Sequence, residues 1–446
     1  MLTRRAFGDD FIWGAATSAA QSEGAWNVDG RGPSIWDTFA AQSKNLSGNN
    51  GPANGSDFYH QYPNDIRLLG LLGFKNFRFS ISWSRILPKG HGRINQKGLS
   101  FYHRLIDLCL LKGITPWCTL YHWDLPQALQ DKGGWANRDI INYFEDYVQL
   151  VTNEFGDKVK HWMVLNEPTA FTGVGYFLGL HAPGKRGLSQ FLPAMHHAAL
   201  CQPIGEMVIR STVPNAYVGT TYSCTGIHPQ SQSVQDVQAA ERMDAMLNRL
   251  FVEPAMGLGY PVKSLPVLRK VYDYFGPNDE KILPCNFDFI GLQPYTREVV
   301  SHRFIIPYLQ AKLIPANERS VQHTAMNWEV YPPVMREMVE KFAAYSNVKD
   351  IIISENGAAF PDQVIDGRID DQQRQSYFVN HLKELQNCVL DGLPVKGYFV
   401  WSLTDNFEWA ESYRPRFGLI YVDYEDQTRI VKDSGYWFQR FLSKTN

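Results

Sequence analysis

Short apolar runs alternate with longer amphipathic stretches along the whole chain. Eight of the runs are rich in β-branched and aromatic residues and have the length of a buried strand; they cover residues 12–17, 76–83, 115–122, 162–166, 217–222, 287–293, 351–354 and 396–401. Helical patterns lie between them, for example over residues 65–72, 99–112, 140–155 and 372–390. Because strands and helices alternate, the pattern predicts parallel strands joined by right-handed crossovers.

Eight such units fit a closed (β/α)8 barrel, the TIM-barrel form of the α/β class, better than an open doubly wound sheet. No linker rich in Ser, Gly or Pro divides the chain, so residues 1–446 are predicted to form a single barrel domain. Three long segments rich in Gly, Pro, Asn and Asp follow strand runs, at residues 23–61, 297–328 and 403–424. Loops in these places lie on the C-terminal face of a barrel, which predicts a deep, loop-walled pocket there.

The composition is that of an ordinary globular protein, with 44% hydrophobic and 20% charged residues. A formal net charge of −2 gives no electrostatic reason to expect nucleic acid or an anionic membrane as a partner. No apolar run approaches the length of a membrane span. The aromatic fraction of 13% suits a carbohydrate site, because sugar rings present apolar faces that pack on aromatic planes, although a large aromatic core explains it at least as well.

The six cysteines are spread thinly and include no C-x-x-C pair; they are Cys109, Cys118, Cys201, Cys224, Cys285 and Cys388. The spacing argues against a zinc site, and the chain is too long for a small disulfide scaffold. Most of these residues lie in apolar runs, which predicts buried free thiols and a reducing compartment. The cytoplasm is therefore the expected location.

Two glutamates directly follow strand runs at the predicted C-terminal face. Glu167 comes after residues 162–166 and Glu355 after residues 351–354. A carboxylate at the end of a buried strand is costly unless it has a partner or a chemical role. Taken alone, either glutamate is as well explained by a strand-end cap or a salt bridge. The matching form of the two strand ends favours a shared role, and paired carboxylates across a pocket are typical of glycoside hydrolysis.

Six segments spaced along the chain carry a specific resemblance. They read FIWGAATS at 11–18, RFSISWSR at 78–85, LYHWDLP at 120–126, NEP at 166–168, SENG at 354–357 and WSLTDNFEW at 401–409. In this order, from the first strand run to the last, they resemble glycoside hydrolase family 1, the β-glucosidase family. Any one segment is weak evidence, whereas six in family order are highly specific.

The resemblance implies a double displacement at the two glutamates. Glu355 would be the nucleophile that forms a glycosyl-enzyme, and Glu167 the general acid/base. Arg78 and Tyr295 are the family-type partners that would keep Glu355 charged and oriented. The chemistry requires Glu167 to hold a proton near neutral pH while Glu355 stays ionised.

The same resemblance implies a sugar pocket. Its expected substrate-binding residues are Gln21, His122, Trp123, Asn166, Gln293, Trp328, Trp401, Glu408, Trp409 and Phe417. Trp401 would be the stacking floor, and Trp328 the platform on the leaving-group side. On local sequence alone, His122 is better explained as a core histidine and the tryptophans as barrel packing. Glu408 could accept hydrogen bonds from the 4- and 6-hydroxyls but would repel a 6-phosphate, which favours unphosphorylated sugars.

One departure from the family pattern affects specificity. The family usually shows Asn-Tyr-Tyr after the sixth strand, whereas this chain has Gln293-Pro294-Tyr295. Gln293 is longer by one methylene than the usual asparagine, and Pro294 removes a backbone donor and fixes φ. Contacts around the 2-hydroxyl or the leaving group are therefore expected to be rearranged.

The leading hypothesis is hydrolysis of terminal, non-reducing β-D-glucosyl residues, with β-fucosyl and β-galactosyl residues as further candidates. The expected substrate is a β-glucoside or a short β-linked oligosaccharide. No cofactor or metal is expected, because the sequence has neither a phosphate-cradling Gly-rich loop nor an H-E-x-x-H pattern. A transglycosidase using the same site remains an alternative. A non-catalytic glycan-binding relative is disfavoured because both glutamates are present.

Overall fold

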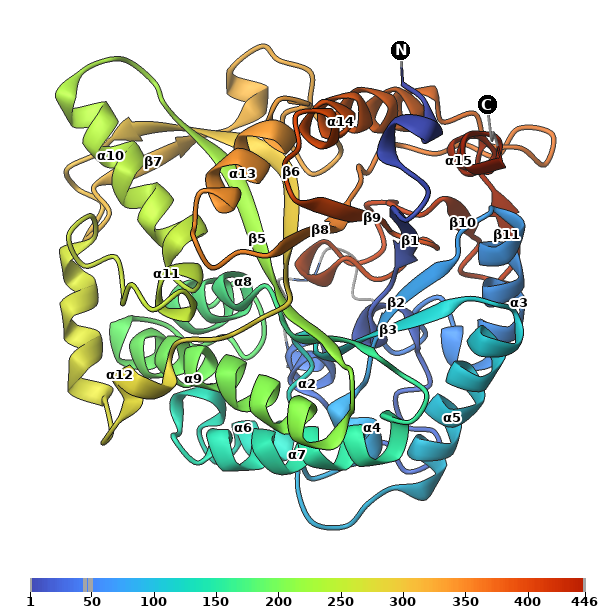
Figure 1. Cartoon of the computed structure of the whole chain (residues 1–446), viewed down its shortest axis with the longest axis horizontal. Helices are drawn as coiled ribbons and strands as arrows, with labels where there is room; N and C mark the ends of the chain where they lie inside the picture. Colours follow the sequence, from blue (N-terminus) through green and yellow to red (C-terminus); the bar gives the residue numbers. More distant parts are fainter. Residues whose placement is uncertain (1, 43–45, 47–50, 444–446) are drawn as a thin grey trace.

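Eight parallel strands form a closed barrel in the computed structural model, which describes residues 2–42, 46 and 51–443 (Figure 1). The barrel strands, in order around it, are β1 (Ile12–Ala16), β2 (Asn76–Ser80), β3 (Thr115–Tyr121), β4 (His161–Asn166), β5 (Tyr217–Pro229), β6 (Phe289–His302), β8 (Asp350–Asn356) and β9 (Val395–Trp401). The β5–β6 and β9–β1 pairings complete the ring. Each predicted strand run overlaps one of these strands, and the (β/α)8 prediction is confirmed.

Helices surround the barrel, the longer ones being α3 (Phe58–Leu71), α5 (Gln96–Leu111), α7 (Ile140–Phe155), α9 (Leu188–Thr212), α10 (Val234–Asp244), α13 (Val334–Ala343), α14 (Gln372–Leu390) and α15 (Asp433–Ser443). The shorter ones are α1 (Ala19–Ser22), α2 (Ile35–Gln42), α4 (Trp83–Ile86), α6 (Gln127–Gln130), α8 (Pro168–Thr172), α11 (Val252–Ala255) and α12 (Asp279–Ile282). Helices α7 and α14 have the predicted bounds. Helix α3 begins seven residues before the predicted 65 and contains Pro63, a residue that usually ends such a pattern.

Two apolar layers account for the runs of hydrophobic residues in the barrel strands. Inside the barrel, side chains from alternate strand positions meet, among them Trp117, Met163, Phe289, Ile352 and Phe399. The residues between them on each strand face the helices and form the larger outer core. Because both faces of a parallel barrel strand are buried, its sequence is nearly continuous in apolar residues rather than alternating.

Strands β5 and β6 continue past the barrel rim and form an arm above the C-terminal face. The outer half of β6 pairs with β5 on one side and with the antiparallel strand β7 (Ala311–Ile314) on the other. The sequence pattern placed residues 297–328 in an irregular loop, and this was wrong for the end of β6 and for β7. The segment holds polar residues and only a short apolar stretch, so its strand form depends on pairing partners that are distant in sequence.

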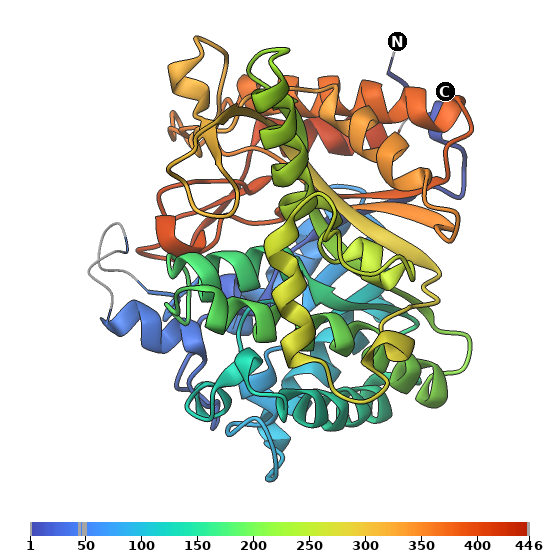
Figure 2. The same ribbon diagram turned by 90° about the vertical axis from the view of Figure 1, so that its left-hand side faces the viewer.

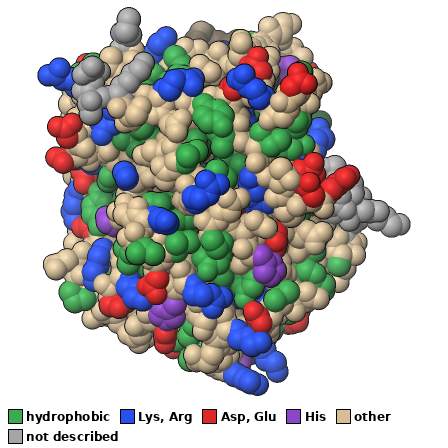
Figure 3. Space-filling view, turned by 90° about the vertical axis from the view of Figure 1, so that its right-hand side faces the viewer, with side chains coloured by type: hydrophobic (Ala, Val, Ile, Leu, Met, Phe, Trp, Pro, Cys, Tyr) green, Lys and Arg blue, Asp and Glu red, His purple; other side chains and the backbone are tan. Residues whose placement is uncertain are grey.

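The loops that follow the strands gather on one side of the molecule. Figure 2 shows this side at the left, with the blue helix α2, the red loop after β9 and the amber segment around β7. On the face shown in Figure 3, side chains of both charge signs are interspersed with apolar ones. Among the described residues, no helix is long and apolar enough to cross a membrane.

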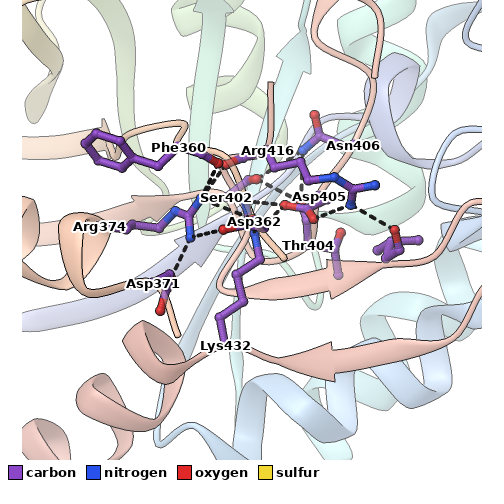
Figure 4. A network of polar contacts seen from close by, with 12 residues as sticks. Phe360, Asp362, Asp371, Arg374, Ser402, Thr404, Asp405, Asn406, Arg416 and Lys432 are labelled. Atoms are coloured by element: carbon purple, nitrogen blue, oxygen red, sulfur yellow. Dashed lines mark hydrogen bonds and ion pairs between the residues drawn. The ribbon is translucent and has the colours of Figure 1, made fainter. Parts of the chain in front are cut away.

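A buried ionic network holds two of these loops to the barrel, as Figure 4 shows. Lys432, just before α15, contacts Asp362 at 2.5 Å and Asp405 at 2.7 Å. Arg374 at the start of α14 also contacts Asp362, at 3.0 Å, and Arg416 contacts Asp405 at 2.7 Å. Lys432 and both aspartates are fully buried. The network therefore connects the loop after β8 and the loop after β9 to each other through the buried side chain of Lys432.

We expect Lys432→Met to destabilise the fold by about 3–5 kcal/mol, because it leaves two buried carboxylates without their shared cation. Denaturant or thermal unfolding measures the decrease in the free energy of unfolding. Lys97→Met is the matched control: the Lys97–Asp29 pair is solvent-exposed, and its loss should cost less than about 1 kcal/mol. Equal effects of the two substitutions would contradict the structural role of the network.

Candidate active site

A cavity of about 380 Å³ opens among the loops at the C-terminal ends of the strands. Twelve of the fourteen predicted site residues line it: Gln21, His122, Trp123, Glu167, Gln293, Tyr295, Trp328, Glu355, Trp401, Glu408, Trp409 and Phe417. The other two, Arg78 and Asn166, are buried beside it and contact the lining residues. Residues separated by up to 396 positions along the chain, from Gln21 to Phe417, thus meet in one pocket.

Glu355 is held by two donors. The Arg78 guanidinium, fully buried on β2, donates to Oε1 of Glu355 at 2.5 Å. The Tyr295 hydroxyl, on β6, donates to Oε2 at 2.8 Å. Both carboxylate oxygens therefore have partners, which fixes the orientation of the group. Two residues on, Gly357 lets the chain pass Trp401, because a Cβ there would lie 1.9 Å from the Trp401 carbonyl oxygen.

The backbone at the end of β4 positions Glu167. It has φ of 47° and ψ of 63°, in the left-handed region, and precedes Pro168 at the first position of α8. This sharp turn stops the strand and starts a helix within one residue. Trp123 and Trp409, also in the pocket, have φ of 73° and 48°. Non-glycine residues in this region are uncommon and cluster at functional sites.

The two carboxyls differ in how easily each loses its proton. Burial raises the pKa of both. For Glu355, the charge of Arg78 and the hydrogen bonds from Arg78 and Tyr295 oppose this rise in pKa. For Glu167, the negative charges of Glu355 and Glu408 add to it, and its pKa lies well above the ordinary range. Glu355 is therefore the group that ionises first, and Glu167 the one that keeps its proton.

Asn166 links Arg78 to the far wall of the pocket. Its Oδ1 accepts hydrogen bonds from Arg78 at 2.5 Å and Gln293 at 2.8 Å, and its Nδ2 lies 3.0 Å from Nε2 of His122. Burial and the charge of Arg78 push the pKa of His122 well below its ordinary value, so this imidazole is neutral. A neutral ring with Nε2 accepting from Asn166 carries its proton on Nδ1.

The loop after β9 supplies the third carboxyl of the pocket. Glu408 accepts a hydrogen bond from Trp401, and burial together with the charge of Glu355 raises its pKa to about 8. Its Oε2, together with Nδ1 of His122 and Oε1 of Gln293, is buried and has no hydrogen-bond partner among the described residues. Buried polar atoms are costly when unpaired. Three such atoms around one cavity are what a ligand rich in hydroxyl groups would satisfy.

Comparison with known proteins agrees with this arrangement. Residues 3–446 match the family model described as glycosyl hydrolase family 1. The chain belongs to glycosyl hydrolase family 1. Beta-glucosidase A of Thermotoga maritima is 42% identical over 98% of this chain and 97% of that protein. Beta-glucosidase A of Acetivibrio thermocellus is 38% identical over 99% of each.

The solved structures give the same result for the fold. The beta-glucosidase from Thermotoga maritima in complex with deoxynojirimycin matches with a TM-score of 0.94 at 41% identity, over 98% of each chain. An enzyme named AHE from Alicyclobacillus herbarius matches with a TM-score of 0.95 at 37% identity, over 98% of this chain and 97% of that one. The (β/α)8 barrel of this family 1 chain is thus shared with its relatives over nearly its full length.

Sequence reasoning missed part of the pocket in this family 1 chain. The additional lining residues include Ala170, His181, Ser223, Cys224, Thr225, Leu247, Thr296, Glu298 and Met326. Several of them lie on the β5–β6 arm, which the sequence pattern did not predict. Glu298 follows Arg297 in a polar stretch without a family motif, so its sequence context does not distinguish it from a surface residue.

Gln293 and Pro294, which differ from the usual family residues, are both held by hydrogen bonds to neighbouring asparagines. The amide of Gln293 donates to Asn166, and its free Oε1 is one of the three unpartnered atoms. Pro294 has no N–H for the sheet ladder. Its carbonyl oxygen accepts a 2.7 Å hydrogen bond from Asn356, next to Glu355.

We expect Glu355→Gln to lower the pKa of Glu167, because the substitution removes the negative charge that helps to raise it. NMR titration of glutamate side chains labelled with 13C measures this directly. Glu318 is an exposed glutamate outside the pocket, so Glu318→Gln is the control and should leave the pKa of Glu167 unchanged. A Glu167 pKa that stays or rises in Glu355→Gln would show that the two carboxyls are not electrostatically coupled.

Proposed function

We propose that this chain is a retaining β-glucosidase that removes terminal, non-reducing β-D-glucosyl residues from a β-glucoside or short β-linked oligosaccharide. The observation that carries the proposal is the unequal pair of carboxyls in one pocket. Glu355 is oriented and kept ionisable by Arg78 and Tyr295, whereas the carboxyl of Glu167 has no such donor among the described residues and retains its proton. Such a pair suits a nucleophile and a general acid.

In the first step, a carboxylate oxygen of Glu355 attacks the anomeric carbon. The bond to the leaving-group oxygen breaks, and Glu167 gives that oxygen its proton. In the second step Glu167 takes a proton from water, whose oxygen attacks the same carbon and releases Glu355. Two inversions at one carbon give net retention. The protonation states needed at the start are those that the two environments favour.

The polar atoms without partners are proposed to bind the glycone. Glu408 would accept from the 4- and 6-hydroxyls, while Nδ1–H of His122 would donate to a hydroxyl oxygen. Trp401 would form the stacking floor; its ring centroid lies 5.9 Å from that of His122. Asn166 and the Gln293 oxygen would bind the side of the sugar that carries the 2-hydroxyl, an interaction that strengthens in the transition state.

Relatives support the glucosyl preference. Those at 42% and 38% identity are beta-glucosidases, and the matching Thermotoga maritima structure holds deoxynojirimycin. β-Galactosyl residues differ from glucosyl ones in the orientation of the 4-hydroxyl, and β-fucosyl residues differ there and also lack the 6-hydroxyl. Glu408 would bind both hydroxyls, so these sugars are secondary candidates. Transglycosylation would use the same glycosyl-enzyme with a sugar or alcohol in place of water. Product analysis with added acceptor separates it from hydrolysis.

We further propose that residues 1–446 act as one catalytic domain in the cytoplasm. The family match over residues 3–446 supports the first part. The state of the cysteines supports the second: all six are free thiols, and five of them are buried. Free thiols persist in a reducing compartment.

Removing either glutamate tests the mechanism. We expect Glu355→Gly to abolish hydrolysis of an aryl β-glucoside and azide to restore part of the activity by giving the α-glucosyl azide. Azide would enter from the face that Glu355 occupied. Glu167→Ala should slow the reaction by about 10²–10⁴-fold for a poor leaving group, and azide should then give the β-glucosyl azide, because the glycosyl-enzyme still forms. Wild-type activity in both variants would end the hypothesis.

The pH profile tests whether Glu355 must be ionised and Glu167 protonated for activity. We expect kcat/KM to be bell-shaped: it falls at low pH as Glu355 gains a proton and at high pH as Glu167 loses one. Tyr295→Phe removes a hydrogen bond that lowers the pKa of Glu355, so the acidic limb should move to higher pH. Tyr436→Phe, outside the pocket, is the control. An acidic limb that moves down in Tyr295→Phe would contradict the role of Glu355.

A further inference from the structure

Strand β6 has an irregularity in the middle of the pocket wall. Cys224 pairs with Pro294, and the next pair is Gly226 with Arg297, so β5 advances by 226 − 224 = 2 residues while β6 advances by 297 − 294 = 3. One extra residue in β6 shifts the alternation of its side chains. Gln293 and Tyr295 face the pocket before the shift, and Thr296 and Glu298 face it after the shift.

Side chains from other elements hold this irregular segment in place. The carbonyl oxygen of Pro294 accepts from Asn356 at 2.7 Å, and that of Tyr295 accepts from the Tyr377 hydroxyl at 3.0 Å. Both donors are buried. The segment is therefore a fixed part of the wall, and it directs Glu298 into the cavity, where regular alternation would have directed Arg297.

Other polar groups on the same wall are already engaged. The Thr225 hydroxyl donates to the carbonyl oxygen of Thr296 at 2.8 Å, and the Thr296 hydroxyl donates to that of Glu329 at 2.9 Å. The side chain of Arg297 reaches Glu329 at 2.9 and 3.0 Å, and Arg319 pairs with the same carboxylate. Each of these donor groups therefore already has an acceptor within the wall.

The carboxyl of Glu298 differs from these groups because it makes no hydrogen bond or ion pair with a described residue. It is half-buried, and burial raises its pKa to about 7 against the opposing charge of Arg319. A carboxyl in a pocket wall without a protein partner has all its lone pairs available to a ligand. It lies on the β5–β6 arm and lines the pocket together with Leu247, from the π-helix at Ala245–Arg249, and with Met326 and Trp328.

We propose that Glu298 is a specificity-determining residue that accepts hydrogen bonds from the hydroxyls of a leaving-group sugar. The preferred substrates would then be β-linked disaccharides and short oligosaccharides rather than aryl or alkyl glucosides. This inference rests on the proposed glucosidase function and extends it to the leaving group.

The chemistry of the outer pocket favours a second sugar. A pyranose has an apolar face to pack on Trp328 and a rim of hydroxyl donors for a carboxyl. An alkyl or unsubstituted aryl group would cover the apolar residues but would leave Glu298 desolvated without a donor, which is unfavourable. A carboxyl among apolar side chains therefore selects against such groups as well as for a sugar.

The test compares two substrates that share a glycone. For wild type, Glu298→Gln, Glu298→Ala and Glu298→Leu, kcat/KM is measured for cellobiose and for 4-nitrophenyl β-glucoside. We expect the cellobiose-to-aryl ratio to fall roughly tenfold or more in Glu298→Ala and Glu298→Leu, since the hydrogen bonds to the carboxyl are lost. Glu298→Gln keeps an acceptor oxygen and should lose less. The loss should be seen mainly in KM for cellobiose.

Glu318→Ala is the matched control, because Glu318 is an exposed glutamate after β7 that does not line the pocket; its ratio should equal that of wild type. A ratio unchanged in all three Glu298 variants, with aryl glucoside still cleaved, would overturn the inference and leave the proposed function standing. Equal losses for both substrates would also overturn it, because they indicate a structural role. Failure of the wild type to cleave any β-glucoside would overturn the proposed function itself.

Discussion

A buried arginine sets the chemistry of this barrel. Arg78 places a positive charge among apolar strands, at a position with no access to solvent. Such a charge requires close partners, and it finds them in Glu355 and Asn166. Through these two contacts it orients one carboxylate. Its charge adds to the burial that lowers the pKa of His122 and keeps that ring neutral, and it opposes the rise in pKa at Glu167.

A second group of buried charges acts at a distance from the first. Lys432 and its aspartates hold the ends of the loops after β8 and β9, and the second of these loops carries Glu408 and Trp409. The barrel strands position Glu167 and Glu355, whereas loops carry many of the other residues that line the pocket. The loop after β9 also packs Phe407 and Leu419 in the hydrophobic core, so the ionic network adds a second buried anchor to that packing.

The sequence predicted the barrel well because each strand is buried on both faces. Such a strand appears as an apolar run, as at β4 and β9, and helices such as α7 and α14 show a clear 3.6-residue period. The prediction failed where structure depends on distant pairing. The outer half of β6 and strand β7 have little apolar pattern, and α3 continues through Pro63.

The same division holds for the pocket. Residues at strand ends, such as Glu167 and Glu355, follow a recognisable apolar run, and motif resemblance identified the residues around them. Glu298 could not be found in this way, because its access to the cavity comes from a shift in strand register that a one-dimensional pattern does not contain.

The register shift in β6 also separates two tasks within a single strand. Of the residues before it, Tyr295 donates to Glu355 and Gln293 donates to Asn166, so both are constrained by these contacts. Residues after it, such as Glu298, face the same cavity but would contact the leaving group of a bound substrate. Exchanges after the shift can therefore alter which molecules are accepted while the bond-breaking groups stay where they are.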